Sequence, residues 1–298
     1  MGAEPGDATL AWAAWAGQHA LALYMLLVAT ALAAAWVAWL GRSRWRAARR
    51  ASNRDSARDS GRASALNSAL NPDGKRGPLG AAGWLASARI GVGFGVIVAA
   101  AWLFAELAEA LDAGPRLGRI DQTFTDALVQ SVPPAALRMF AVLTHFGDTI
   151  TLTLLCIAVS IALIARRERL LALGWVAAVA GNALLNTTLK QVFERARPVH
   201  ADGWVAAPGY SFPSGHSSGS LVAYGMLAYL AVRVLPARWH LPAVLAAVAL
   251  ALSVGASRVF LRVHFASDVL AGFASGAAWW VVCVTSMEVT RWWWRRAR

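Results

Sequence analysis

The chain has 298 residues, of which 58% are hydrophobic and only 15% are charged, and its formal net charge is +12. Soluble domains are about 45–50% apolar, so this composition argues against an ordinary soluble domain. The positive charge does not indicate a nucleic-acid partner. Most Lys and Arg residues lie in alternate connections between the apolar segments and in the C-terminal tail. That alternation is typical of a polytopic membrane protein, whose partner is the lipid bilayer.

Seven predominantly apolar segments are long enough to cross a bilayer, which takes about 17–25 helical residues. Because lipid offers no hydrogen bonds to the backbone, we expect each of them to be a helix. They are residues 20–40, 89–111, 149–165, 170–189, 217–235, 241–257 and 268–288. The predicted fold is therefore an all-α polytopic membrane helical bundle, with a six-helix core at 89–290 and one extra N-terminal transmembrane helix.

The first apolar segment, within 1–40, is interpreted as a membrane anchor. Residues 1–19 contain Glu4 and Asp7 but no Lys or Arg, so they lack the basic start of a secretory signal peptide. The positive-inside rule assigns the basic connections to the cytoplasm. We therefore expect an integral protein of the cell (inner) membrane, with the N-terminus outside and the C-terminus in the cytoplasm.

Segment 41–88 differs in composition from the apolar segments. It is rich in Arg, Ser, Ala, Asn and Gly, contains Pro72 and Pro78, and has no sustained apolar period. It is expected to be a basic, flexible cytoplasmic linker. Its arginines either set the topology or bind anionic lipid head groups. The tail 291–298 is also basic and expected to be cytoplasmic.

Polar residues mark the next parts of the chain. The outer connection 112–147 carries several aspartates, including Asp121, and a short amphipathic helix on the membrane surface is expected there. Asp148 is interpreted as the N-cap of the span at 149–165. Asn182 and Asn186, inside the span at 170–189, are expected to hydrogen-bond to neighbouring helices.

Three patches on the outward-facing connections combine basic and catalytic residue types. The first is KQVFERARP, which gives Lys190 and Arg197 followed by Pro198; the second is PSGH at 213–216; the third is SRVFLRVHFASD at 257–268. Taken singly, each patch is ambiguous, because a lone histidine beside a glycine is usually a turn or cap residue. Basic residues on the outer side run against the positive-inside rule, and chemistry would explain them.

The residue types in these patches are those that bind and transfer a phosphoryl group. Lys190, Arg197 and Arg258 can surround a phosphate, and the arginines offer two-pronged hydrogen bonding. Gly215 and His216 open a helix, whose free N–H groups and dipole favour an anion. His264 and Asp268 are four residues apart on one helical face, so the carboxylate can orient the imidazole as a nucleophile.

In their order and spacing these elements resemble the type 2 phosphatidic acid phosphatase superfamily, a group of membrane lipid phosphatases related to vanadium haloperoxidases. The pattern of that family, K-x6-RP, then PSGH, then SR-x5-H-x3-D, is present in full. The resemblance covers roughly residues 89–288, and it leaves out the first helix and the basic linker.

The resemblance implies a role for each matched residue. His264 would attack phosphorus, Asp268 would orient it, and His216 would protonate the leaving oxygen and then activate water. The phosphoryl oxygens would be held by Lys190, Arg197, Ser214, Gly215 and Arg258. Arg195 and Arg262 lie beside the motifs and would either face the site or pair with lipid phosphate. No cofactor is expected, and no metal, because the sequence offers no cluster of carboxylates for a two-metal site.

The function expected from these residues is hydrolysis of a lipid phosphate monoester or diphosphate, such as undecaprenyl diphosphate, phosphatidic acid or phosphatidylglycerol phosphate. The active site would lie on the extracytoplasmic face. A phosphotransferase that uses the same phosphohistidine and a non-catalytic lipid-binding or transport protein are the alternatives. The sequence does not rank the lipids or give an oligomeric state.

Overall fold

The structure is a computed structural model that describes residues 5–67, 81–198, 205 and 208–296, and this part of the chain is helical with no strands. The helices are α1 (Pro5–Gln18), α2 (Ala20–Asn67), α3 (Ala81–Asp112), α4 (Arg116–Ser131), α5 (Pro134–Leu143), α6 (Thr149–Ala165), α7 (Arg169–Phe193), α8 (Gly215–Val234), α9 (His240–Phe260) and α10 (Ala266–Arg296), with short 3-10 helices η1 (Thr144–Gly147) and η2 (Ala237–Trp239). The predicted all-α class is confirmed.

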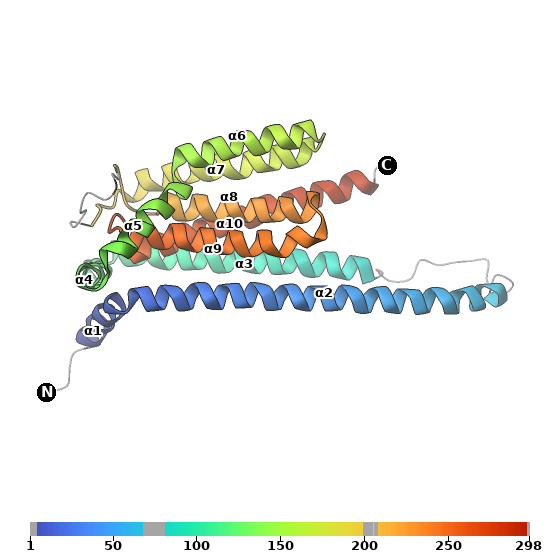
Figure 1. The fold of residues 1–298 in the computed structure, drawn as a ribbon, viewed down its shortest axis with the longest axis horizontal. Coiled ribbons are helices and arrows are strands. Elements are labelled where there is room, and N and C mark those ends of the chain that lie inside the picture. Colours follow the sequence, from blue (N-terminus) through green and yellow to red (C-terminus); the bar gives the residue numbers. More distant parts are fainter. Residues whose placement is uncertain (1–4, 68–80, 199–204, 206–207, 297–298) are drawn as a thin grey trace.

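Long helices lie side by side along one axis, and shorter elements gather at one end of the bundle (Figure 1). Helices α3 and α6 to α10 form the body, with α2 along its side. Helix α4 is seen end-on in this view, so it runs across the bundle axis. α1, α4, α5 and the segment that follows α7 occupy the same end as the start of α8 and α10.

The expected spans correspond to helices of the structure. Within the described residues, five helical segments are long and apolar enough to cross a membrane, namely Ala20–Trp45, Gly91–Asp112, Arg169–Phe193, Ala237–Phe260 and Ala266–Trp294. Helix α6 is apolar but shorter, with 17 residues. Helix α8 is less apolar because its first turns have the sequence GHSSGS, and those serines are buried inside the bundle. The bend of 118° between α4 and the α5–η1 segment places these helices at the bundle end.

The described part of segment 41–88, which was expected to be a flexible linker, is helical. Helix α2 continues without a break to Asn67, and α3 already begins at Ala81. The physical reason is the residue content of 41–67, which has many Ala and Arg residues and no proline. Ala and Arg favour the helix even where no apolar face is present. Pro72 and Pro78 lie outside the described residues.

Three apolar clusters lie within the described part of the bundle, and the two with the most buried residues are described here. One joins α6, α7, α8 and α10 around the fully buried Trp175 and Met226. The second lies at the end where the short helices gather, and it stacks Phe140 of α5 on Phe260 of α9 with a ring separation of 4.2 Å. Tyr24 of α2 meets both rings edge-on and bonds Ser253 through its hydroxyl. The first turns of the extra N-terminal helix thus pack against the core, whereas most of its apolar span is exposed.

Helix α1 is packed closely on α4. A Cβ added at Gly17 would lie 2.5 Å from the Phe124 carbonyl oxygen and 2.6 Å from the Ala127 Cβ. Glycine has no Cβ, so the two backbones approach as near as they do. The Ser131 hydroxyl also donates to the Gly17 carbonyl oxygen at 3.0 Å. This contact attaches the N-terminal segment to the bundle end that carries the motifs.

Candidate active site

The three sequence motifs meet at one end of the bundle. The first lies at the end of α7 and in the segment after it, the second at the start of α8, and the third at the end of α9 and the start of α10. A backbone bond joins two of them, because the Ser214 N–H donates to the Asp268 carbonyl oxygen at 2.9 Å. A Cβ at Gly272 would lie 2.5 Å from the Ser214 carbonyl oxygen. The absence of a side chain at Gly272 therefore lets α10 approach the PSGH turn.

His264 and Asp268 form the expected pair. The His264 Nδ1 lies 3.3 Å from Asp268 Oδ2, which also accepts the Phe265 N–H at 2.9 Å. The other ring nitrogen, Nε2, is 3.1 Å from Nη1 of Arg197. A guanidinium only donates, so Nε2 must accept, and the ring proton is therefore on Nδ1, facing Asp268. This tautomer puts the ring lone pair on Nε2, where it accepts from Arg197 in this structure.

Burial keeps His264 neutral. Its side chain is only 2% exposed, and this burial lowers its pKa from 6.5 to about 3, with Asp268 opposing the shift. Burial also lowers the pKa of Arg197, again against Asp268. A buried charged group favours whatever compensates its charge, so Arg197 favours a bound anion.

Arg197 is fixed by backbone carbonyls of two segments. Its Nη1 donates to the Val263 oxygen at 2.6 Å, and its Nε donates to the Gly209 oxygen at 2.9 Å. Its Nη2 reaches the oxygens of Pro208 and Tyr210. The same Tyr210 oxygen accepts a hydrogen bond from Lys190 Nζ. The guanidinium therefore ties the segment after α7 to the turn before α10, next to His264.

Arg258 is the third basic residue of the site. It is only 3% exposed, and its Nη1 donates to the Thr144 hydroxyl of η1 at 2.6 Å, while its Nε has no partner within the described residues. A buried donor without a partner is costly unless a ligand satisfies it. The charge of Arg258 acts on both His216 and His264, so it lies near both imidazoles.

The PSGH turn opens α8. Ser214 is fully buried at the N-cap position, where its Oγ accepts from the Ser217 hydroxyl. A Cβ at Gly215 would lie 2.7 Å from Oδ1 of Asn186, which explains the glycine in this motif. Asn186 donates to the Pro213 oxygen, and Asn182 donates to the Ser218 hydroxyl, as expected for bonds between chain segments. A helix N-terminus offers free N–H groups, and α8 begins at Gly215 of this motif.

Asp148 was expected to cap α6, but its carboxylate contacts two histidines instead. It occupies the N-cap position of α6 with an extended backbone, but its side chain makes no capping bond. Oδ1 lies 2.8 Å from Nε2 of His216, and Oδ2 lies 2.7 Å from Nδ1 of His145. The contact with His216 could not be predicted from the sequence, because 68 residues separate it from Asp148.

Arg195 binds the carboxylate of Asp268 and that of Asp121. Its Nη1 donates to Asp268 Oδ1 at 2.6 Å and to the Ser267 hydroxyl at 2.7 Å, and its Nη2 donates to Asp121 Oδ2 at 2.8 Å. Arg195 was expected either to face the site or to pair with lipid phosphate. Its bond to Asp268 favours the first of these. Asp121 was missed, because a carboxylate on a surface helix gives no sequence signal of burial.

Arg262 lies in the turn between α9 and α10, with φ at 57° and an exposed fraction of 5%. Its burial lowers the pKa of the guanidinium and argues against pairing with lipid at the surface.

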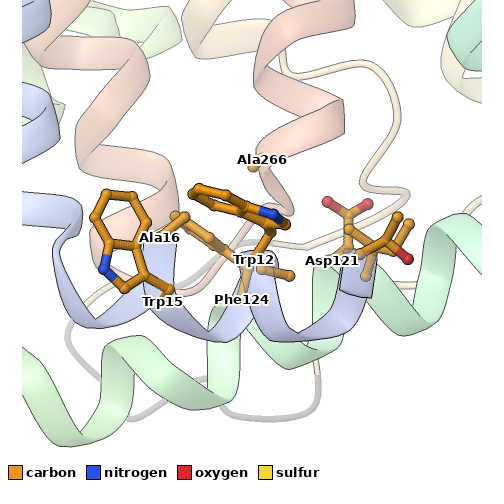
Figure 2. A pocket seen from close by; sticks show the side chains of 9 residues that line it. Trp12, Trp15, Ala16, Asp121, Phe124 and Ala266 are labelled. Atoms are coloured by element: carbon orange, nitrogen blue, oxygen red, sulfur yellow. The ribbon is translucent and has the colours of Figure 1, made fainter. Parts of the chain in front are cut away.

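An apolar cavity of about 500 Å³ lies beside this centre, between α1 and α4 (Figure 2). Trp12 and Trp15 of α1 form one wall, and Phe124 and Asp121 of α4 lie opposite. Ala266, two residues before Asp268, closes it. The cavity shares Asp121 with the Arg195 cluster, but none of the three motif cations lines it.

Several known proteins are similar to this chain. A sequence model described as the PAP2 superfamily matches residues 169–292. Phosphatidylglycerophosphatase B of Bacillus subtilis (strain 168) is 33% identical over 158 residues, which cover 52% of this chain and 77% of that protein.

Two solved structures are also similar. The crystal structure of the transmembrane PAP2 type phosphatidylglycerolphosphate phosphatase from Bacillus subtilis has a TM-score of 0.61 and 30% identity, covering 64% of this chain and 96% of that one. The crystal structure of Aquifex aeolicus LpxE has a TM-score of 0.40 and 21% identity, covering 52% and 88%. The identity and coverage of the Bacillus relative, together with the complete motifs at the bundle end, show that this chain is an integral membrane protein of the PAP2 superfamily.

Proposed function

We propose that the protein is a membrane lipid phosphatase that hydrolyses a lipid phosphate monoester or diphosphate through a phosphohistidine on His264. The observation that carries this proposal is the tautomer of His264. Asp268 and Arg197 together place the proton on Nδ1 and leave the Nε2 lone pair beside a guanidinium. A phosphoryl group bound by Arg197 would meet the nucleophile at that atom.

The reaction would proceed in two steps. In the first, Nε2 of His264 bonds to phosphorus, the bond from phosphorus to the lipid oxygen breaks, and His216 gives that oxygen a proton. In the second, a water oxygen attacks phosphorus, the phosphorus–nitrogen bond breaks, and His216 takes the proton from water. Fixed cations and the N–H groups of α8 would stabilise the charge on the equatorial oxygens. No step uses a metal ion.

The similarity to phosphatidylglycerophosphatase B makes phosphatidylglycerol phosphate the first substrate to test. Purified protein in detergent should release inorganic phosphate from at least one of phosphatidylglycerol phosphate, phosphatidic acid and undecaprenyl diphosphate. Vanadate should inhibit competitively, and EDTA should have no effect. Transfer of the phosphoryl group to a second lipid, with no free phosphate, would favour the phosphotransferase alternative. Loss of activity in EDTA that magnesium restores would overturn the metal-free mechanism.

The role of His216 is tested by the leaving group. A lipid alkoxide leaves poorly without a proton, and general acid catalysis contributes about 10²–10⁴-fold. A nitrophenolate leaves readily without one. His216→Ala should therefore slow lipid hydrolysis far more than hydrolysis of p-nitrophenyl phosphate, whereas His264→Ala should abolish both. Equal losses on the two substrates would exclude His216 as the general acid.

A further inference from the structure

His216 is held by a chain segment that belongs to none of the three motifs. This segment, η1 with Asp148, connects α5 to α6. The Asp148 carboxylate is bonded to two imidazoles, His216 through Oδ1 and His145 through Oδ2. The His145 side chain is 63% exposed, and that of His216 is 21% exposed. The carboxylate therefore joins a solvent-facing imidazole to an inner one.

The segment is fixed on several sides. The Tyr224 hydroxyl of α8 donates to the Phe146 carbonyl oxygen at 2.7 Å, and Arg258 of α9 donates to the Thr144 hydroxyl. A Cβ at Gly147 would lie 2.4 Å from Val254 Cγ1 and 2.9 Å from Cδ2 of the His216 ring. Because Gly147 has no side chain, η1 lies directly against that ring. This arrangement holds the imidazole between the segment and α8.

The contacts assign the protons on His216. A carboxylate accepts and does not donate, so the proton between Asp148 and His216 is on Nε2. Nδ1 is then the nitrogen left for a substrate, and it can give a proton only when the ring carries both protons. A neighbouring carboxylate favours that imidazolium form.

We propose that Asp148 is a positioning residue for the reaction, which fixes the ring of His216 and sustains the imidazolium that protonates the leaving oxygen. This inference rests on the proposed function, in which His216 is the general acid. Asp148 and His216 then repeat, on the acid side of the site, the pairing of carboxylate and imidazole that Asp268 and His264 make on the nucleophile side. His145 holds the second oxygen of the carboxylate in place.

The charges around His216 support this role. His216 lies one residue before the expected span, and the charged groups that face it are Arg258 of α9, Arg197 after α7 and Asp148, with His145 behind Asp148. Burial and then Arg258 lower the pKa of His216 to about 4 in the ligand-free protein, and Asp148 opposes them. Without Asp148, burial and the two arginines would lower the pKa of His216 further. A bound phosphate would neutralise the arginines but would not replace the bond to Nε2.

The test uses Asp148→Asn in the full-length protein, with p-nitrophenyl phosphate and the lipid substrate found for the wild type. The basic limb of kcat for the lipid reports the acid in the enzyme–substrate complex. Loss of a neighbouring opposite charge shifts a pKa by about 1–3 units, so this limb should move to lower pH by that amount. The lipid rate at neutral pH should fall about 10-fold or more, with a smaller loss on p-nitrophenyl phosphate.

Three further variants make the test specific. Glu288→Gln removes a carboxylate that pairs with Arg233 and Tyr229 at the opposite end of the bundle, and it should leave the pH profile unchanged. Asp148→Glu keeps the charge, so the basic limb of its pH profile should lie close to that of the wild type. If Asp148→Asn does not fold, Asp148→Glu is compared with the wild type in its place. In a His216→Ala background, Asp148→Asn should cause no additional loss.

Two outcomes would overturn the inference. One is an unshifted basic limb with equal losses on both substrates, in proportion to lost thermal stability. The other is a full additional loss from Asp148→Asn when His216 is already alanine. If His216→Ala itself shows no dependence on the leaving group, the proposed acid fails and the inference fails with it. If His216→Ala behaves as expected and Asp148→Asn does not, only the role of Asp148 is lost.

Discussion

The buried imidazole of His264 links the chemistry of the site to the stability of the fold. Its folded pKa of about 3 lies below the unfolded value of about 6.5. Between these values the unfolded chain binds a proton that the folded chain does not, so stability falls as the pH falls below 6.5. The expected loss from this group is roughly 2 kcal/mol between pH 6.5 and pH 5.

Thermal unfolding in detergent measures this effect. The wild type should lose melting temperature as the pH is lowered from 7 to 5, and His264→Asn, which cannot titrate there, should lose less. The matched variant His240→Asn changes an exposed histidine at the start of α9, and it should keep the wild-type slope. Equal slopes for the wild type and His264→Asn would contradict a buried neutral imidazole.

Arg195 bridges two buried carboxylates, which a lysine cannot do in the same way. Its planar fork reaches Asp121 and Asp268 at once, whereas an ammonium is a point charge. Removing one member of a buried ion pair costs about 3–5 kcal/mol, and the conservative change should cost less than that.

We therefore expect Arg195→Lys to lower both the melting temperature and kcat, because Asp268 loses a partner that orients it. The control is Arg233→Lys, which alters the Arg233–Glu288 pair of the opposite bundle end and should leave kcat unchanged. A lowered melting temperature with wild-type kcat would show that Arg195 does not act on Asp268.

At the scale of single elements, the contact between α1 and α4 positions Asp121. Gly17→Val should force the helices apart, because its Cβ would meet the Phe124 oxygen and Ala127 within 2.6 Å. Overpacking of this kind typically costs about 1–3 kcal/mol. Since α4 carries Asp121, kcat should fall as well.

Gly118→Val is the matched control on α4 itself, because an added Cβ there meets nothing within 4 Å. Valine favours a helix more than glycine does, so this variant should not lose stability and should leave kcat near the wild-type value. If Gly17→Val destabilises the protein without changing kcat, the N-terminal segment serves the fold alone.

The elements that could be predicted from the sequence are those with a local signal. Apolar runs predict the long helices, of which five are apolar and long enough to span a membrane within the described residues, and the motif spacing predicts Lys190, Arg197, His216 and His264 as site residues. Asp148 and Asp121 could not be found in this way, because their partners lie 68 and 146 residues away and depend on how the helices pack. The helical course of α2 past residue 41 was missed because polar composition was interpreted as lack of structure, although Ala and Arg favour a helix.

For the whole molecule, the alternation of basic connections predicts which end of the bundle faces the cytoplasm. The motif end carries α1 and the segment after α7, and the C-terminus lies at the opposite end (Figure 1). The positive-inside rule predicts an N-terminus outside, and the candidate active site would then face the extracytoplasmic side.

Cysteine labelling tests this orientation. A cysteine at position 205 should react with an impermeant thiol reagent added to intact cells, and a cysteine at position 60 should react only after lysis. The two native cysteines lie in α6 and α10, where Cys283 is buried, and each can be replaced by alanine beforehand. The reverse labelling pattern would place the site in the cytoplasm.

The cluster of Asp121, Arg195 and Asp268 also sets an order in biosynthesis. Asp121 is made early, Arg195 follows after three more α-helices, and Ser267 and Asp268 belong to α10. Until α10 has been inserted, Arg195 has only Asp121 to pair with and His264 has no carboxylate to hold its proton. A nascent chain therefore has the cations of the site before it has the oriented nucleophile. The enzyme becomes competent only when its final helix has been inserted.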